Sequence, residues 1–194
     1  VDSRSYRVDG VVREPPETRA GGHVFLTLEG TRITALEGNN LRRVDAGGDA
    51  ETASDGGATV DQTDADGPTL RAAAFEPTKR FRDRVRGLRA GDRITACGEV
   101  TEGTLKLEKF AVRDLVRTEW VTPDCPDCDR SMSSAGRSAG YRCKDCGTHA
   151  DERVERPLDR DLEIGWYEVP PCARRHVAKP LVRGGFDAPI HPER

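Results

Sequence analysis

The sequence predicts a mainly β protein with one helix, built from two small modules rather than one large core. Hydrophobic residues make up 35% of the 194 residues and aromatic residues only 5%, which is little material for a single large interior. Strand patterns separated by turn residues fill the first part of the chain, and a single helical pattern interrupts them. Two closely spaced cysteine pairs mark a second, smaller module farther along.

Strands are predicted where apolar residues alternate between turn signals. Glu29-Gly30-Thr31 predicts a tight turn between two of these strands, and Glu102-Gly103 predicts a hairpin turn. The apolar pattern slips by one residue between Leu107 and Phe110, which indicates a β-bulge. The expected strands cover residues 6–12, 23–28, 32–36, 69–75, 93–101 and 104–115.

One helix is expected from Thr78, which follows Pro77 and can act as its N-cap, to Leu88. Its apolar positions Phe81, Val85 and Leu88 fall on one face. A five-stranded Greek-key barrel with its helix between the third and fourth strands is the OB-fold, an arrangement that serves nucleic-acid binding. Other small α+β domains share this order of elements. We expect an OB-fold domain over residues 1–117.

The charges are unevenly distributed. Residues 45–68 hold seven of the 34 acidic residues and no Lys or Arg, so the rest of the chain is mildly basic. This stretch consists mostly of Gly, Asp, Ala, Ser and Thr, and we expect residues 38–68 to be a disordered acidic insertion. The excess of Arg over Lys and the abundance of Asp suggest a halophilic source. No apolar run is long enough to span a membrane, so a cytoplasmic protein is expected.

Cys125-Pro-Asp-Cys128 and Cys143-Lys-Asp-Cys146 are two C-x-x-C pairs separated by 14 residues. Each pair can sit on a tight turn that presents both sulfurs to one ion, and four thiolates complete a tetrahedron around zinc. Disulfides, free thiols or an iron–sulfur centre are the alternatives. A zinc ribbon over residues 118–156 is expected, and its zinc is structural because four sulfurs leave no open position for water.

Two stretches concentrate positive charge: the predicted helix, and a C-terminal tail over residues 157–194. The tail is expected to form a short helix between Pro171 and Pro180. Trp166 can stack on bases or pack the tail onto the ribbon, and we expect packing. A basic helix face can bind phosphates or be a solvated surface. The candidate nucleic-acid contacts are Lys79, Arg82, Arg86, Arg142, Arg174, Arg175 and Lys179.

Other side chains offer no catalytic constellation. The sequence contains no glycine loop for a phosphate, no metal-binding carboxylate pair and no nucleophile beside a base. Cys97 lies in a predicted strand and is expected to be a buried apolar thiol. Cys172 has nothing beside it that marks it as a nucleophile. A binding role is therefore expected rather than catalysis by this chain.

Several motifs together resemble one family. They are the run from Cys125 to Thr148, Gly165-Trp166-Tyr167-Glu168-Val169-Pro170 and the segment 173–181, with Gly21-Gly22-His23-Val24 and Phe75-Glu76-Pro77-Thr78-Lys79 upstream. This combination resembles the C-terminal end of the archaeal tRNA-isoleucine 2-agmatinylcytidine synthetases (TiaS). The acidic insertion departs from that resemblance.

The resemblance implies a role in tRNA modification, in which ATP drives attachment of agmatine to the anticodon wobble cytidine of isoleucine tRNA. It implies that the catalytic half lies N-terminal to the OB domain, either missing or separately encoded. This chain would then bind tRNA, while ATP and agmatine would bind only the full-length enzyme. A single-stranded DNA-binding protein and a zinc-held protein adaptor are the alternatives.

Overall fold

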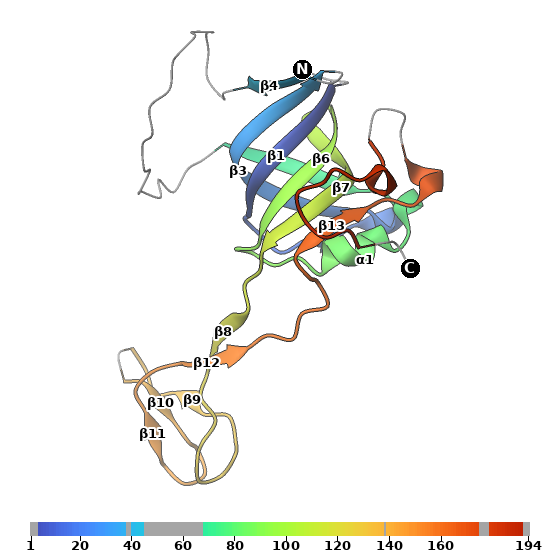
Figure 1. The fold of residues 1–194 in the computed structure, drawn as a ribbon. Coiled ribbons are helices and arrows are strands. Elements are labelled where there is room, and N and C mark those ends of the chain that lie inside the picture. Colours follow the sequence, from blue (N-terminus) through green and yellow to red (C-terminus); the bar gives the residue numbers. More distant parts are fainter. Residues whose placement is uncertain (1–3, 38–39, 45–67, 138, 175–178, 192–194) are drawn as a thin grey trace. The chain divides into compact units, whose positions relative to one another are not determined.

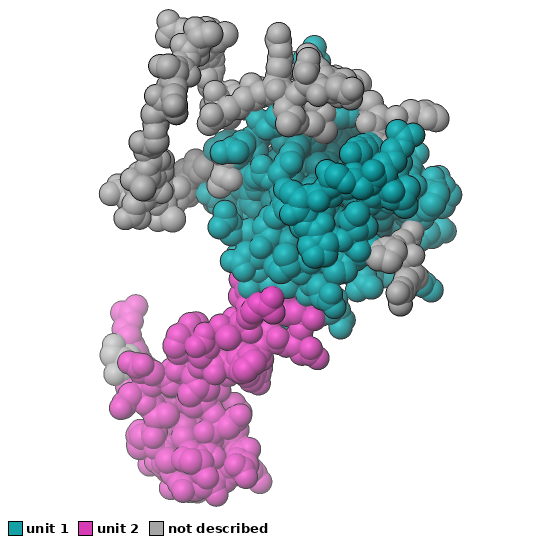
Figure 2. Space-filling model, in the orientation of Figure 1, with its two compact units in different colours: residues 1–115, 161–194 teal, residues 116–160 magenta. Residues whose placement is uncertain are grey.

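The computed structural model describes residues 4–37, 40–44, 68–137, 139–174 and 179–191 (Figure 1). The chain divides into two compact units, one of residues 1–115 with 161–194 and one of residues 116–160 (Figure 2). The boundaries lie close to those expected between the barrel and the ribbon. The C-terminal segment, expected as a separate tail, shares the unit of the barrel.

The first unit is a closed barrel of five strands: β1 (Arg4–Val12), β3 (Val24–Glu37), β5 (Thr69–Ala74), β6 (Arg93–Thr101) and β7 (Thr104–Asp114). Strand β1 pairs with β3 and β6, β3 pairs with β5, and β6 pairs with β7, all antiparallel. A parallel pairing of β5 with β7 closes the ring. The predicted mainly β class with an OB-type barrel is confirmed.

Strand β3 differs from the expectation, because the predicted turn at Glu29-Gly30-Thr31 is wrong. The chain runs through these residues as one strand of 14 residues. The pairing with β1 shifts register between Asp9 and Gly10, and a Cβ at Gly10 would lie 2.5 Å from the carbonyl oxygen of Glu29. Gly10 therefore allows the two backbones to approach closely. Gly30 is an interior residue of the strand and does not reverse the chain.

The hairpin and the bulge in β6 and β7 are as predicted. Glu102 and Gly103 both have positive φ, which is the turn geometry that matches the twist of a hairpin. Cys97 pairs with Lys109 whereas Gly98 pairs with Leu107, so Glu108 is the extra residue of the bulge. A short strand β2 (Glu17–Thr18) pairs with β3 at the other end of the barrel.

The helix α1 (Phe81–Arg86) follows the 3₁₀ turn η2 (Glu76–Thr78) and covers the barrel with the predicted apolar face. Phe81, Val85 and Leu88 are all buried in the core. The Phe81 ring lies 5.5 Å from that of Phe110, which stacks on Tyr167 at 5.2 Å. This apolar interior fixes the barrel that carries the surface sites.

The C-terminal segment adds β13 (Gly165–Glu168) to the outer edge of β7. Trp166 is buried beside Cys97, Ala111 and Leu181, so the expectation that it packs onto the ribbon is wrong. The 3₁₀ turn η3 (Pro171–Ala173) ends at Arg174, which is extended, so the predicted helix does not continue through it. A second 3₁₀ turn, η4 (Leu181–Arg183), follows Pro180.

The Glu168 carboxylate explains this course, because it accepts hydrogen bonds from Arg174 and from the Leu181 amide. These contacts tie Arg174 and Leu181 to β13, and residues 175–178 between them lie outside the described residues.

The second unit contains two small sheets. Strand β8 (Thr118–Val121) pairs with β12 (Val154–Pro157), and β10 (Tyr141–Arg142) lies between β9 (Ser133–Ser134) and β11 (His149–Ala150). Its buried cluster is small and consists of Cys125, Met132 and Cys143. So few apolar contacts cannot by themselves hold a unit of this size.

The expected acidic insertion is only partly described. Its residues Asn40–Val44 form β4, which pairs with the end of β3, and residues 45–67 lie outside the described residues. Within the part of the chain that the structure describes, no helix is long and apolar enough to cross a membrane.

Candidate zinc centre and nucleic-acid surfaces

The two cysteine pairs occupy matching turns. In the first, the Cys125 amide donates to the Arg130 carbonyl and its carbonyl accepts from the Asp129 amide, both at 2.8 Å. In the second, the Cys143 amide donates to the Thr148 carbonyl at 2.9 Å and its carbonyl accepts from the Gly147 amide at 3.1 Å. Asp129 and Gly147 both have positive φ. Gly147, directly after the second cysteine pair, can adopt this left-handed conformation without steric cost.

The turns are connected side chain to side chain. Thr148 Oγ1 donates to Asp127 Oδ2 at 2.6 Å, and Arg130 forms a salt bridge of 3.1 Å with Asp145. The ligand sulfurs of the four cysteines lie within 4.8 Å of one another. Cys125 and Cys143 are buried, whereas Cys146 is exposed. The fold therefore brings together the four residues that the spacing predicted.

Without a metal, these thiols perturb one another. Hydrogen bonds from the side chain and amide of Thr148 lower the pKa of Cys146 to about 6. Hydrogen bonding to Cys146, followed by burial, raises the pKa of Cys128 to about 12. Burial also raises the pKa of Cys125. Four sulfurs at this separation cannot all ionise unless a cation offsets their charge.

The donor set fits zinc. Four cysteines from two matching turns are a tetrahedral structural set, and the small core of this unit needs such a crosslink. The quartet Cys125, Cys128, Cys143 and Cys146 is a structural zinc site, as the spacing predicted. All four positions are taken by protein, so the ion would hold the turns together rather than activate water.

The basic residues of α1 have contacts within the protein. Arg82 donates to the Gly22 carbonyl and forms a 3.5 Å salt bridge with Glu76. Arg86 pairs with Asp83 and donates to Thr18 Oγ1 at 3.0 Å. Lys79 lies 3.6 Å from Glu76 and is largely exposed. These partners connect the helix to the turns around it, and they leave Lys79 the most accessible of the three.

The tail residues are distributed differently. Arg174 pairs with Glu168 and is mostly buried. Lys179 is exposed, and its Nζ lies 5.3 Å from the centre of the Phe186 ring. Lys109, beneath it, donates to the Lys179 carbonyl. Arg175 lies outside the described residues.

Arg142 is the candidate contact in the ribbon. It is exposed and lines a groove of about 750 Å³ beside the second cysteine pair, together with Lys144 and His149. Ser133, Ser134 and Ala135 form a wall of small side chains. This groove presents basic groups next to the zinc site, within the same unit.

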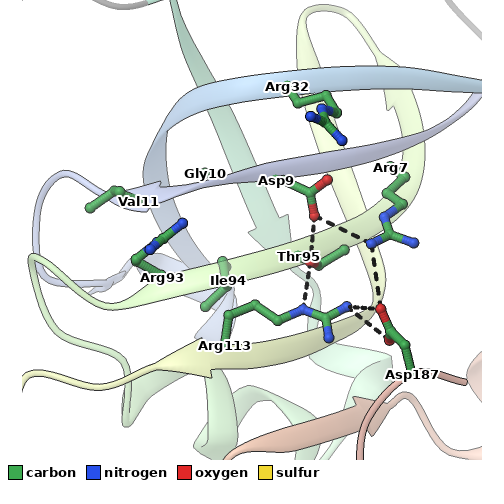
Figure 3. A pocket seen from close by; sticks show the side chains of 10 residues that line it. All are labelled: Arg7, Asp9, Gly10, Val11, Arg32, Arg93, Ile94, Thr95, Arg113 and Asp187. Carbon is green, nitrogen blue, oxygen red and sulfur yellow. Dashed lines mark hydrogen bonds and ion pairs between the residues drawn. The ribbon is translucent and has the colours of Figure 1, made fainter. Parts of the chain in front are cut away.

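Sequence reasoning missed a basic pocket on the barrel (Figure 3). Its volume is about 500 Å³, and its charged lining consists of Arg7, Asp9, Arg32, Arg93, Arg113 and Asp187. These residues come from β1, β3, β6, β7 and the C-terminal segment. Alternation of Arg7, Asp9 and Val11 with the buried Val8 and Val12 was the available signal, but the clustering depends on strand register.

Comparison with known proteins gives consistent results. Residues 122–162 match the TiaS C-terminal zinc ribbon domain family. The chain is 54% identical to the isoleucine-tRNA 2-agmatinylcytidine synthetase TiaS of Haloquadratum walsbyi, over 100% of this chain and 43% of the relative. It is 41% identical to TiaS of Methanosarcina acetivorans, over 100% of this chain and 38% of the relative.

The chain is also similar to solved structures of TiaS. The crystal structure of TiaS in complex with isoleucine tRNA and ATP matches 96% of this chain and 36% of that chain, with a TM-score of 0.68 and 34% identity. The complex of TiaS with isoleucine tRNA, AMPCPP and agmatine matches 98% of this chain and 35% of that chain, with a TM-score of 0.65 and 32% identity. The chain thus spans less than half the length of the relatives that it matches.

Proposed function

We propose that this chain, which is homologous over its whole length to the C-terminal portion of the TiaS synthetases, is the part of such a ligase that holds tRNA. One observation carries the proposal: the whole chain, barrel, ribbon and tail together, aligns with these proteins at up to 54% identity. A shared zinc ribbon alone would be weak support, because ribbons serve many functions.

The reaction that we propose for the complete enzyme is the ATP-dependent attachment of agmatine to the wobble cytidine of isoleucine tRNA. The relatives' names support it, and a related structure contains tRNA, an ATP analogue and agmatine. We assign no step of this chemistry to the residues of this chain. Its proposed partners are the tRNA and a catalytic portion of the enzyme, and its proposed location is the cytoplasm.

The candidate contacts differ in how free they are to meet a phosphate. Lys79, Arg142 and Lys179 are exposed, and we propose them as direct contacts. Lys79 also lies 3.6 Å from Glu76, but 63% of its side chain remains accessible. Arg82, Arg86 and Arg174 already pair with acidic side chains, so we propose that they contact tRNA only while remaining in those pairs. Arg175 completes the proposed set from its position in the sequence.

A competition experiment tests the tRNA assignment. The purified full chain is mixed with labelled isoleucine tRNA, and unlabelled single-stranded DNA of equal nucleotide content is added at molar salt. At high salt the gain from counterion release is small, so binding depends on shape and direct contacts. We expect tRNA to remain bound. Equal or stronger binding of the DNA would instead support a single-stranded DNA-binding protein, and no binding of either would support a protein adaptor.

A further inference from the structure

We propose that the basic pocket on the barrel is a phosphate site for the tRNA backbone, with Arg32 and Arg93 as its contact residues. This inference rests on the proposed function and specifies one surface that would perform it. The pocket lies wholly within the barrel unit, so its geometry does not depend on where the ribbon lies.

Strand register explains why these side chains meet. Asp9 on β1 pairs with Arg32 on β3 and with Thr95 on β6, and Val11 pairs with Arg93. Directly opposed residues of antiparallel strands point to the same face of the sheet. Val8 and Val12 point inward and are fully buried, so Asp9 and Val11, which alternate with them, face outward. The barrel wall therefore gathers arginines from two strands on either side of β1.

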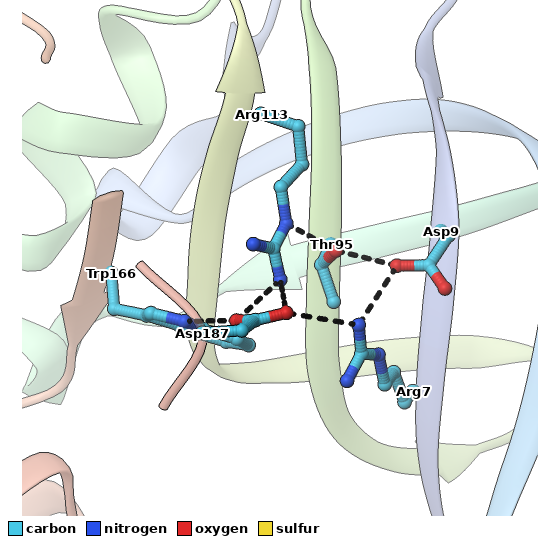
Figure 4. A network of polar contacts seen from close by, with 6 residues as sticks. All are labelled: Arg7, Asp9, Thr95, Arg113, Trp166 and Asp187. Atoms are coloured by element: carbon cyan, nitrogen blue, oxygen red, sulfur yellow. Dashed lines mark hydrogen bonds and ion pairs between the residues drawn. The ribbon is translucent and has the colours of Figure 1, made fainter. Parts of the chain in front are cut away.

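The floor of the pocket is a closed ring of polar contacts (Figure 4). Thr95 Oγ1 donates to Asp9 and accepts from Arg113 Nε at 2.8 Å. Arg113 donates to both Asp187 oxygens, at 3.0 and 3.1 Å. Arg7 completes the ring with salt bridges of 3.8 Å to Asp187 and 3.6 Å to Asp9. Two arginines and two aspartates thus balance one another.

The ring also fixes its members. Trp166 Nε1 donates to Asp187 at 3.0 Å, and the Arg113 guanidinium lies 5.1 Å from the centre of the Trp166 ring. Because Arg113 has partners on both sides, it is held in one orientation and its charge is already matched. The pocket therefore has a rigid, electrically neutral base made by the C-terminal segment and the barrel together.

Arg32 and Arg93 are the charges left over. Both are exposed and both line the pocket (Figure 3). Asp9 stands opposite Arg32 and Asp114 opposite Arg93 in the strand register, but among the described residues no acidic side chain forms a salt bridge with either arginine. They lie on β3 and β6, with β1 between them. The pocket as a whole thus has an excess of two positive charges over a neutral base.

The two unmatched arginine charges favour binding of a phosphodiester. Arginine donates several hydrogen bonds in a plane and suits phosphate oxygens, and two arginines across a polar pocket can bind one phosphate or two successive ones. A wide surface pocket suits a backbone that passes through it. A free nucleotide has the same phosphate chemistry, so the experiment has to separate the two sources.

The test measures affinity for isoleucine tRNA across a series of salt concentrations for the wild type, Arg32→Gln/Arg93→Gln and Arg183→Gln. Arg183 is an exposed arginine of the same unit outside the pocket, so twice its effect is the loss expected from removing two charges alone. The double variant should lose about tenfold or more in affinity at low salt, and the salt slope should fall by about 1 to 2 units. Thermal unfolding should be unchanged in both variants.

The outcomes separate the two proposals. If the wild type binds no tRNA, the proposed function fails and the inference fails with it. If the wild type binds but the double variant loses no more than twice what Arg183→Gln loses in binding free energy and salt slope, only the phosphate site is rejected. Competition with ATP is the second arm, at ATP concentrations that leave the salt slope unchanged. If ATP displaces tRNA from the wild type but not from the double variant, the pocket is a free-nucleotide site. That result would overturn the backbone assignment.

Discussion

Different interactions stabilise the interior of the barrel unit and the interior of the ribbon unit. In the barrel, Phe110 lies between Phe81 and Tyr167 in a continuous apolar core. In the ribbon, the buried cluster consists of Met132 and two of the four zinc-site cysteines. The comparison shows that one chain can specify a fold by apolar pattern in one region and by ligand chemistry in another.

Removing the zinc should produce the largest difference between the units. Structural zinc contributes about 10–16 kcal/mol to the folding of finger peptides, more than a ribbon of this size could replace. Chelation, or Cys143→Ser, should therefore unfold residues 116–160 and leave the barrel folded. Hydrogen exchange measured along the chain checks this, with about one zinc per chain expected in the untreated protein.

Cys172→Ser is the matched control, because Cys172 is exposed and lies outside the quartet. It should leave both the zinc content and the exchange pattern unchanged. Full protection of the ribbon amides after complete metal removal would show that the apolar cluster is sufficient, and the comparison between the units would collapse.

A core truncation should affect the units in the opposite way. Phe110→Ala removes a fully buried ring and should cost about 3–5 kcal/mol of barrel stability. The zinc-loaded ribbon should keep its protection. Met132→Ala is the counterpart in the ribbon and should cost less, because the metal still closes the turns. Chemical denaturation followed through Trp166 in a Trp120→Phe background, because Trp120 lies in the ribbon unit, and separately through zinc release distinguishes the two transitions.

Features encoded by neighbouring residues were predictable from the sequence, whereas features that depend on the pairing of distant strands were not. The cysteine quartet was predictable because a C-x-x-C pair encodes its geometry within four residues, and Gly147 directly follows the second pair. The bulge near Phe110 and the hairpin at Glu102 and Gly103 are equally local. The turn predicted at Gly30 was wrong because this glycine lies inside a strand, and only the pairing of β3 with β1 reveals this.

The basic pocket could not be predicted for a related reason. Arg32 and Arg93 are 61 positions apart in sequence, and Asp187 is farther still. Only the register of three strands and the path of the C-terminal segment bring them to one surface. Arg82 shows the converse, because a basic residue on a helix face turned out to pair with Glu76 and the Gly22 carbonyl.

The C-terminal segment offers a smaller test of how the barrel is completed. Asp187→Asn removes the charge that Arg113 and Arg7 share, and should loosen residues 181–191 without unfolding the barrel. The free energy of local opening should fall by about 1 kcal/mol, the low end for a charged hydrogen-bonding group, because the Asp187 side chain is 55% exposed and water screens its charge. Hydrogen exchange at the His191 amide, which donates to the Trp166 carbonyl, and at the Trp166 amide, which donates to the Pro189 carbonyl, reports the loosening.

The same contact should respond to pH. Burial tends to raise the pKa of Asp187, but hydrogen bonds from Trp166 and Arg113 outweigh it and leave the pKa lowered. A carboxyl with a lowered pKa in the folded state stabilises that state above its unfolded value of about 3.9, and the contribution disappears as the pH falls through the lower folded value. Docking should thus be constant near neutrality and weaken only in acid, and Asp187→Asn should remove that acid dependence.

The reactivity of the cysteine thiols should also differ between the units, and this is the smallest of the expected effects. Cys97 is buried under the C-terminal segment, and burial raises its pKa to about 11 from an ordinary value of 9.0. At pH 8 its thiolate fraction should be about 100-fold lower than that of an unperturbed thiol, so alkylation should be slow. Cys172 should react readily, and the four ribbon sulfurs should be protected by zinc. Chelation should expose those four and leave Cys97 unreactive; rapid labelling of Cys97 in the folded barrel would mean that the C-terminal segment does not cover it.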